Sequence, residues 1–227
     1  MAMHNFDQFA DDYVKINDQF SSFFREDTTY FARYKASYVA RLVGTNFAGK
    51  ILDFGCGIGL VSNRLHELLP AAHVDGIDSS QASITRARTD TDGGPKVRYF
   101  DSEADLDREY DVIIMANVLH HVPPGDRQSV LAHVFSLLGA TGAVVVFEHN
   151  TWNPLVMRIV KKHPFDQDAA FLSPMETARL VRAAGFSVRT DFIVFFPSFL
   201  KSLRRLEPRL RYLPIGGQYA CVGRKGA

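Results

Sequence analysis

The stretch KILDFGCGIG, residues 50–59, decides the fold class of this 227-residue chain. Its first half is an apolar run that predicts a buried strand, and its second half places three glycines directly before a helical pattern. Glycines at such a turn allow positive φ and let the backbone approach a ligand closely. The N–H groups at the start of the following helix add hydrogen-bond donors. We therefore expect a ligand site at the carboxyl end of this strand.

The rest of the chain repeats this alternation of strand and helix patterns. Strands that alternate with helices predict right-handed crossovers and a parallel sheet covered on both faces, and the last two strands are expected to form a hairpin-like closing pair. Helices are predicted over about residues 60–69 and after Ser79-Ser80. Another is predicted over 127–138, where residues 139–142 end it, and a last one runs from its cap at Ser173 to about Ala184. Strands are predicted over residues 50–54, 73–78, 96–100, 110–117, 143–149, 188–197 and 218–224.

The acids around the glycine turn indicate which ligand it takes. A dinucleotide site requires G-x-G-x-x-G, but Leu60 stands where the third glycine of that pattern belongs. Asp53 at the end of the strand would repel a pyrophosphate and suits a cationic ligand instead. Asp78 ends the next strand, 21 residues past Gly57, where it can accept hydrogen bonds from a ribose diol. The pattern favours a nucleoside with a positively charged tail over a glycine turn that binds nothing.

Five segments together resemble the class I S-adenosylmethionine-dependent methyltransferases. This resemblance implies an α/β, Rossmann-like, doubly wound fold with a seven-stranded, mostly parallel sheet, an antiparallel last strand and an N-terminal helical lid. It implies a single methyltransferase domain over residues 1–227, with the lid at 1–45, a cofactor-binding core at 46–150, and a substrate cap with closing strands at 151–227. The matching segments are ILDFGCGIG (51–59), VDGIDSS (74–80), VRYFDSEADL (97–106), YDVIIMANVLHHV (110–122) and LLGATGAVVVFEH (137–149).

The resemblance also implies a set of residues that bind S-adenosyl-L-methionine. The methionine end of the cofactor would be held by residues in and beside the glycine loop, namely Asp53, Gly55, Cys56, Gly57 and Gly59. The ribose would be bound by Asp78 and Ser79, and the adenine by Asp101 and Ser102. Asn117 and Val118 would line the sulfonium side, and Tyr13 would be contributed by the lid.

Methyl transfer from a sulfonium is an in-line displacement with an activated donor, so alignment and exclusion of water are the main tasks of the protein. A base is needed only where the acceptor must lose a proton. His121, His149 and Glu148 follow the fourth and fifth predicted strands and are the candidate catalytic residues, although histidines in such turns are often packing residues. His120 ranks below them. No metal is expected, because clustered carboxylates and a zinc-type set of cysteines are both absent from the pattern.

The composition restricts the class of partner. Lys and Arg number 26 against 25 Asp and Glu, a net charge of +1, which argues against bulk electrostatic binding of nucleic acid. No apolar run is long enough to cross a bilayer, and the first residues carry no signal-peptide pattern. Two cysteines, 165 positions apart, are typical of a reduced, cytoplasmic protein. We expect a methyltransferase that modifies oxygen or nitrogen of a small-molecule acceptor.

Specificity for the acceptor is expected from three parts outside the core: the N-terminal helices, residues 150–172 and residues 196–217. The last of these carries five basic residues between Lys201 and Arg211 against one acid, Glu207. It could be a solvated helix, a pocket for an anionic molecule, or a weak contact with an anionic membrane surface. The last reading implies a lipid-linked or quinone-like acceptor. A catalytically silent, cofactor-binding regulatory domain is the non-enzymatic alternative.

Overall fold

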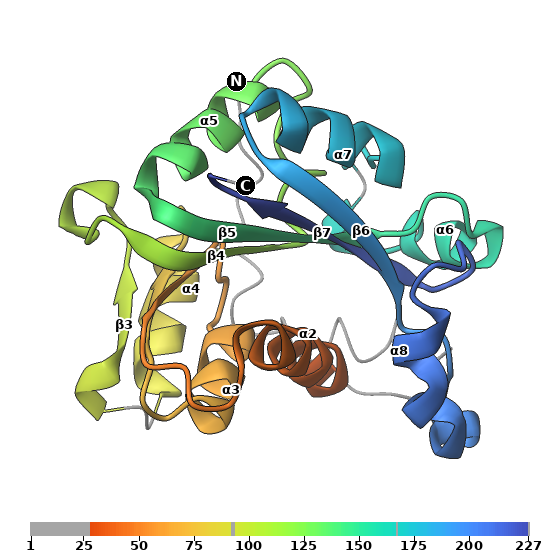
Figure 1. Ribbon diagram of the computed structural model, residues 1–227, viewed down its shortest axis with the longest axis horizontal. Helices are drawn as coiled ribbons and strands as arrows, with labels where there is room; N and C mark the ends of the chain where they lie inside the picture. Colours follow the sequence, from red (N-terminus) through yellow and green to blue (C-terminus); the bar gives the residue numbers. More distant parts are fainter. Residues whose placement is uncertain (1–27, 92–93, 167, 227) are drawn as a thin grey trace.

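The computed structural model describes residues 28–91, 94–166 and 168–226. Seven strands form one mixed sheet in the order β3-β2-β1-β4-β5-β7-β6 (Figure 1). The first five strands run parallel, and β7 lies antiparallel between β5 and β6. The strands are β1 (Lys50–Phe54), β2 (His73–Ile77), β3 (Val97–Phe100), β4 (Tyr110–Ala116), β5 (Leu138–His149), β6 (Ser187–Ile193) and β7 (Gln218–Arg224). The expected doubly wound sheet with an antiparallel last strand is confirmed.

Helices cover both faces of the sheet. In Figure 1, α2 (Thr28–Val43), α3 (Leu60–Leu68) and α4 (Gln81–Thr89) lie below it, and α5 (Arg127–Leu137) and α7 (Pro174–Ala183) lie above it. Two short helices, α6 (Pro154–Val160) and α8 (Glu207–Leu210), lie beyond the sheet on the side of β6 and β7. In the part of the chain that the structure describes, no helix combines the length and the hydropathy needed to span a membrane.

The central strands are apolar on both faces because both faces are covered. In β4, Val112 and Ile114 pack into the core on the side of α2, α3 and α4, whereas Ile113 and Met115 pack into the core on the side of α5 and α7. A strand buried on both sides needs a continuous apolar run rather than an alternating pattern. This is why the segment YDVIIMA predicts a central strand so clearly.

Two element boundaries differ from the sequence-based prediction. Residues 139–142, expected to separate a helix from a strand, belong to β5, which begins at Leu138. Leu138 pairs with Tyr110 across a register shift in the β4–β5 ladder, so the two glycines of this stretch lie in an irregular strand end. The strand expected over 188–197 ends at Ile193, because Val194 has a φ of 60° and leaves the extended conformation.

The order of the strands determines where the site lies. After β1 the chain adds β2 and β3 on one side, and it then returns to add β4 and β5 on the other side of β1. Connections therefore leave the carboxyl ends of β1 and β4 in opposite directions, which opens a crevice between them. The glycine turn follows β1, and Asn117 follows β4, at this crevice.

Arg127 fixes the loop between β4 and α5, which carries His120 and His121. Its side chain is 2% exposed, and its Nε donates to the carbonyls of Leu119 and Val122, each at 3.1 Å. Its Nη2 donates to the carbonyl of Ala170, in the segment that precedes α7, and Nη1 lies 3.5 Å from a carboxylate oxygen of Glu176. One guanidinium thus joins two segments that border the crevice.

We predict that Arg127→Met lowers the free energy of unfolding by about 3 kcal/mol. The substitution leaves several carbonyl groups without their charged donor in a buried place, and such losses cost ~1–3 kcal/mol each before relaxation. Urea denaturation of the purified chain measures the change. Arg179→Met, an exposed position on α7, is the matched control and should shift the stability by less than about 0.5 kcal/mol. Equal stabilities of the two variants would contradict the role given to Arg127.

Candidate active site

A cavity of about 970 Å³ opens at the carboxyl ends of β1, β2, β4 and β5 and is bordered by residues of α2 and α6. Most of the residues proposed from the sequence line it. They are Asp53, Gly55, Cys56, Gly57, Asp78, Ser79, Asp101, Asn117, Val118, His121 and His149.

Three candidates take other positions, and one lies outside the described residues. Gly59 packs against Tyr99, and Ser102 caps a short 3-10 helix by accepting from the Ala104 N–H. Glu148 is 1% exposed and lies behind His120 rather than in the cavity lining. Tyr13 falls in residues 1–27, which the structure does not describe.

The glycine loop has the conformation that only glycine adopts readily. Gly55, Gly57 and Gly59 have φ values of 75°, 53° and 79°. A Cβ on Gly55 would lie 2.6 Å from Val118, and one on Gly59 would lie 2.3 Å from the Tyr99 hydroxyl oxygen. At Gly57 a Cβ would meet no atom within 4 Å. Gly55 and Gly59 are therefore required for packing, whereas Gly57 leaves open space in which a ligand can approach the backbone.

Asp78 holds this loop against the start of α4. Its Oδ2 accepts from the Gly57 N–H at 2.8 Å, and its Oδ1 accepts from the Ser80 N–H at 2.9 Å. The carboxylate also lines the cavity, as a group that binds a ribose diol must. Because each carboxylate oxygen can accept more than one hydrogen bond, the structural contacts leave room for this second task.

Asp53 is a buried carboxylate with one oxygen directed toward no protein donor. Ser62 Oγ donates to its Oδ2 at 2.7 Å, and Oδ1 is buried without a hydrogen-bond partner among the residues that the structure describes. Burial raises the pKa of Asp53 to about 6, against the lowering effects of Ser62 and Lys35. A carboxylate in this state gains from a cationic ligand, because the ligand would supply the missing donor and charge.

Lys35 on α2 is a cavity residue that the sequence did not reveal. It is 6% exposed, and its Nζ donates to Asn117 Oδ1 at 3.2 Å. Burial lowers the pKa of Lys35 to about 8, although the charges of Glu148 and Asp53 oppose this shift. The sequence feature that could have pointed to Lys35 is its helical spacing, because it follows the buried Ala32 by three residues and precedes the buried Val39 by four.

The loop end of the cavity therefore fits a ligand that carries both a cationic and an anionic group. Asp53 and Lys35 line it together and influence the pKa of each other. The α-amino and α-carboxylate groups of an amino acid are such a pair of charges. Asp78 and Ser79 extend the same lining toward Asp101, where a nucleoside would extend from the amino-acid part.

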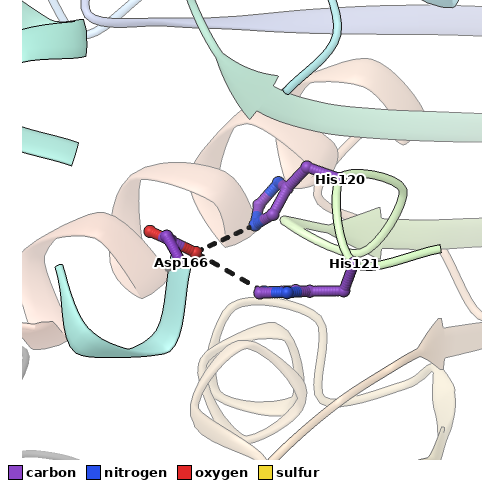
Figure 2. Close-up of side chains that lie close together, drawn as sticks. All are labelled: His120, His121 and Asp166. Atoms are coloured by element: carbon purple, nitrogen blue, oxygen red, sulfur yellow. Dashed lines mark ion pairs between the residues drawn. The ribbon is translucent and has the colours of Figure 1, made fainter. Parts of the chain in front are cut away.

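The other end of the cavity carries a cluster of histidines and acids. His120 contacts Glu148 through its Nδ1, and its backbone N–H donates to Glu148 Oε1 at 3.3 Å. On the opposite edge of the ring, His120 Nε2 lies 3.3 Å from Asp166 Oδ1, and His121 Nε2 lies 3.6 Å from the same oxygen (Figure 2). Asp166 comes from the 3-10 turn η5 (Pro164–Asp166), in a part of the chain with no recognisable motif.

The charges in this cluster shift the ionisation of its members. Burial alone would lower the pKa of His120, but Glu148 and Asp166 raise it to about 9. Burial would raise the pKa of Asp166, but its hydrogen bond with His120 brings it to about 2. His149 differs, because burial lowers its pKa to about 4. Its imidazole is therefore neutral at physiological pH, with Nε2 3.4 Å from Asn117 Nδ2.

A comparison with protein families matches residues 52–144 to a family described as a methyltransferase domain. The ubiquinone biosynthesis O-methyltransferase of Aeromonas salmonicida is 31% identical over 163 residues, which cover 64% of this chain and 66% of that protein. The trans-aconitate 2-methyltransferase of Escherichia coli is 35% identical over 107 residues, which cover 45% of this chain and 40% of that protein. The chain thus matches about two thirds or less of the length of these relatives.

Solved structures share the fold of this chain. A SAM-dependent methyltransferase from Archaeoglobus fulgidus has a TM-score of 0.67 at 16% identity and covers 91% of this chain and 98% of its own. The sheet order, the acid–glycine loop and the matched family model together define one class of protein. The chain belongs to the class I S-adenosylmethionine-dependent methyltransferases. The cofactor of that family is S-adenosylmethionine, and the charges at the loop end of the cavity fit its amino-acid part.

We predict that Asp53→Asn stabilises the cofactor-free protein at pH 8 by ~1–3 kcal/mol. The folded-state pKa of about 6 lies above the usual 3.8, so the carboxyl contributes stability below pH 3.8 that is lost as the pH rises through 6. Asparagine removes that loss and still accepts from Ser62. Urea denaturation at pH 8 and at pH 4 measures the difference between the variant and the wild type. The stabilisation by Asp53→Asn should vanish at pH 4. A stabilisation that is equal at pH 8 and pH 4 would contradict the raised pKa of Asp53.

Proposed function

We propose that this chain transfers the methyl group of S-adenosylmethionine to an oxygen or nitrogen atom of a small-molecule acceptor. The observation that carries the proposal is a single cavity that joins the acid–glycine loop to the histidine cluster. The names of two matched relatives, a ubiquinone biosynthesis O-methyltransferase and a trans-aconitate 2-methyltransferase, support small-molecule methylation and favour an enzyme over a silent binding domain.

At the loop end, the residues of the chain bind and orient the donor. When bound, S-adenosylmethionine supplies a methyl group that is already activated on a sulfonium. Asp53 accepts from the amino group of the methionine part, and Lys35 pairs with its carboxylate. Asp78 and Ser79 hold the ribose hydroxyls. The remaining assignments are Asp101 and the Ser102 backbone for the adenine, Asn117 and Val118 for the sulfonium side, and Tyr13 for the lid.

At the histidine end, the residues position the acceptor and exclude water. His149 lies beside Asn117, where β4 and β5 end, and its neutral ring can hydrogen-bond the reacting group of the acceptor. His121 lines the same half of the cavity. Val156 and Val160 of α6 add apolar side chains to the cavity lining, and an apolar wall beside the acceptor holds little water. Glu148 acts by positioning His120 rather than by touching the acceptor.

Two guanidinium groups of the basic segment at 201–211 contact other parts of the chain. Arg204 donates to the Phe196 carbonyl at 3.0 Å and lies 4.3 Å from the centre of the Tyr30 ring. Arg211 contacts the ring of Tyr212. The comparisons favour neither a lipid-linked acceptor nor a silent domain, and contact of this segment with an anionic membrane surface stays a prediction of the sequence.

We predict that Lys35→Met weakens binding of S-adenosylmethionine about tenfold by removing the partner of the donor carboxylate, since hydrogen bonds to charged groups contribute ~1.5–3 kcal/mol. Calorimetry measures the dissociation constant. Arg33→Met, an exposed change on the same helix, is the control and should leave it unchanged.

Decarboxylated S-adenosylmethionine makes this test specific to the carboxylate. The wild type should bind it more weakly than the intact donor, whereas Lys35→Met should bind the two with equal affinity. If the variant still prefers the intact donor by the wild-type factor, Lys35 does not bind the carboxylate.

We predict that His149→Ala lowers kcat about a hundredfold and leaves the dissociation constant of the donor unchanged, because its side chain acts on the acceptor. Release of S-adenosylhomocysteine, measured against pools of phenols, carboxylic acids and amines, gives kcat. His73→Ala, at the exposed start of β2, is the control. Equal kcat in His149→Ala and wild type would remove His149 from the site. Donor binding by the wild type without turnover in any pool would favour the silent-domain alternative.

A further inference from the structure

The histidine end of the cavity brings three possible metal ligands together. His120 and His121 come from the loop after β4, and Asp166 comes from η5, more than forty residues later. One ligand atom from each of them lies within 4.8 Å of the other two. Figure 2 shows both imidazole rings directed toward the Asp166 carboxylate.

Two of the three separations between these atoms match those around a small divalent ion, and the third pair lies within 4.8 Å. Nitrogen and oxygen ligands lie about 2.0–2.2 Å from Zn²⁺, so neighbouring ligand atoms in a tetrahedral shell lie roughly 3.3–3.6 Å apart. His120 Nε2 and Asp166 Oδ1 are 3.3 Å apart, and His121 Nε2 and the same oxygen are 3.6 Å apart. An ion could enter between them with small side-chain movements.

The surroundings of His120 are those of a metal-binding histidine. Glu148 accepts from the Nδ1 side of the ring, which leaves Nε2, the nitrogen that faces Asp166, as the coordinating atom. Metal-bound histidines usually direct their second nitrogen at such a carboxylate, which orients the ring and increases its basicity. Glu148 also accepts from the backbone N–H of His120, so both the ring and its backbone are fixed.

The charge balance also favours a divalent cation. Two nearly buried carboxylates, Glu148 and Asp166, face one histidine ring from opposite edges. A proton on the ring would offset only one of the two negative charges, whereas a divalent ion in place of that proton would offset both. His163 lies near the other Asp166 oxygen, with Nδ1 3.9 Å from Oδ2.

We propose that His120, His121 and Asp166 bind a divalent transition-metal ion of the zinc, manganese or cobalt class in the acceptor half of the cavity. Two imidazoles and one carboxylate suit such ions better than Mg²⁺ or Ca²⁺, which prefer oxygen ligands alone. Three protein ligands leave at least one coordination position open. Both histidines and Asp166 line the cavity, so that position is accessible to an oxygen of the acceptor. The sequence predicted no metal because it contains no cluster of carboxylates.

Cobalt(II) is the probe for this site because its visible absorbance reports histidine and carboxylate ligands directly. The full chain, stripped with a chelator, should bind one equivalent of Co²⁺ with a saturable absorbance between about 500 and 650 nm, and Zn²⁺ should displace it. His121→Ala and Asp166→Asn should abolish the absorbance. Glu148→Gln should weaken the affinity about tenfold to a hundredfold by loosening His120. His73→Ala, far from the cluster, should titrate like the wild type.

The outcomes separate this proposal from the methyltransferase activity. The proposal is wrong if the wild type shows no saturable Co²⁺ absorbance, or if the absorbance survives in both His121→Ala and Asp166→Asn. The cluster would then be only an ion pair between His120 and its two acids. Binding of S-adenosylmethionine to the same stripped samples, measured by calorimetry, checks that each variant is folded. That measurement reports the donor half of the cavity whether or not a metal binds.

Discussion

The reversal of strand order between β1 and β4 is the constraint on which the site depends. Because the chain leaves these two strands in opposite directions, no connection crosses above their carboxyl ends, and polar groups can be placed there without disrupting the two cores. The glycine loop, Asp53, Asn117 and the histidines are all attached to these strand ends or to those of their neighbours. The parallel pairing of β1 with β4 holds the two ends together, and the absence of a side chain at Gly55 leaves room for Val118.

The two halves of the cavity differ in how far the chain itself compensates their buried charges. At the loop end, Asp53 and Lys35 lack full compensation, and burial shifts the pKa of each toward its neutral form. Such a site is costly in the free protein and gains from a ligand of complementary charge, so binding and stability are coupled. At the histidine end, His120 lies between two acids that hold its charge. In that half, the charged ring already meets carboxylates of the chain itself before any ligand arrives.

The sequence predicted the parts of the site that depend on local pattern. The acid–glycine loop, the acid after β2 and the polar residues after β4 and β5 follow from strand ends and periodicity, and they meet because parallel strands share one edge. Asp166 could not be found in this way, and helical spacing places Lys35 on the buried face of α2 without placing it in the cavity. Both residues reach the cavity only through the packing of α2 and the path of residues 150–172, which no short-range pattern specifies. Glu148 was found, but its direction toward His120 rather than the cavity depends on the side chains around it.

Asn117 connects the two halves through its unusual backbone. Its φ of 62° is uncommon for a residue other than glycine, and it directs the amide group between Lys35 and His149. The ammonium of Lys35 can only donate, so it must face the amide oxygen, and the NH₂ group must face His149 Nε2. That nitrogen then accepts, and the proton of the neutral ring resides on Nδ1. Asn117 thereby favours one tautomer of His149 and links the donor side of the cavity to the acceptor side.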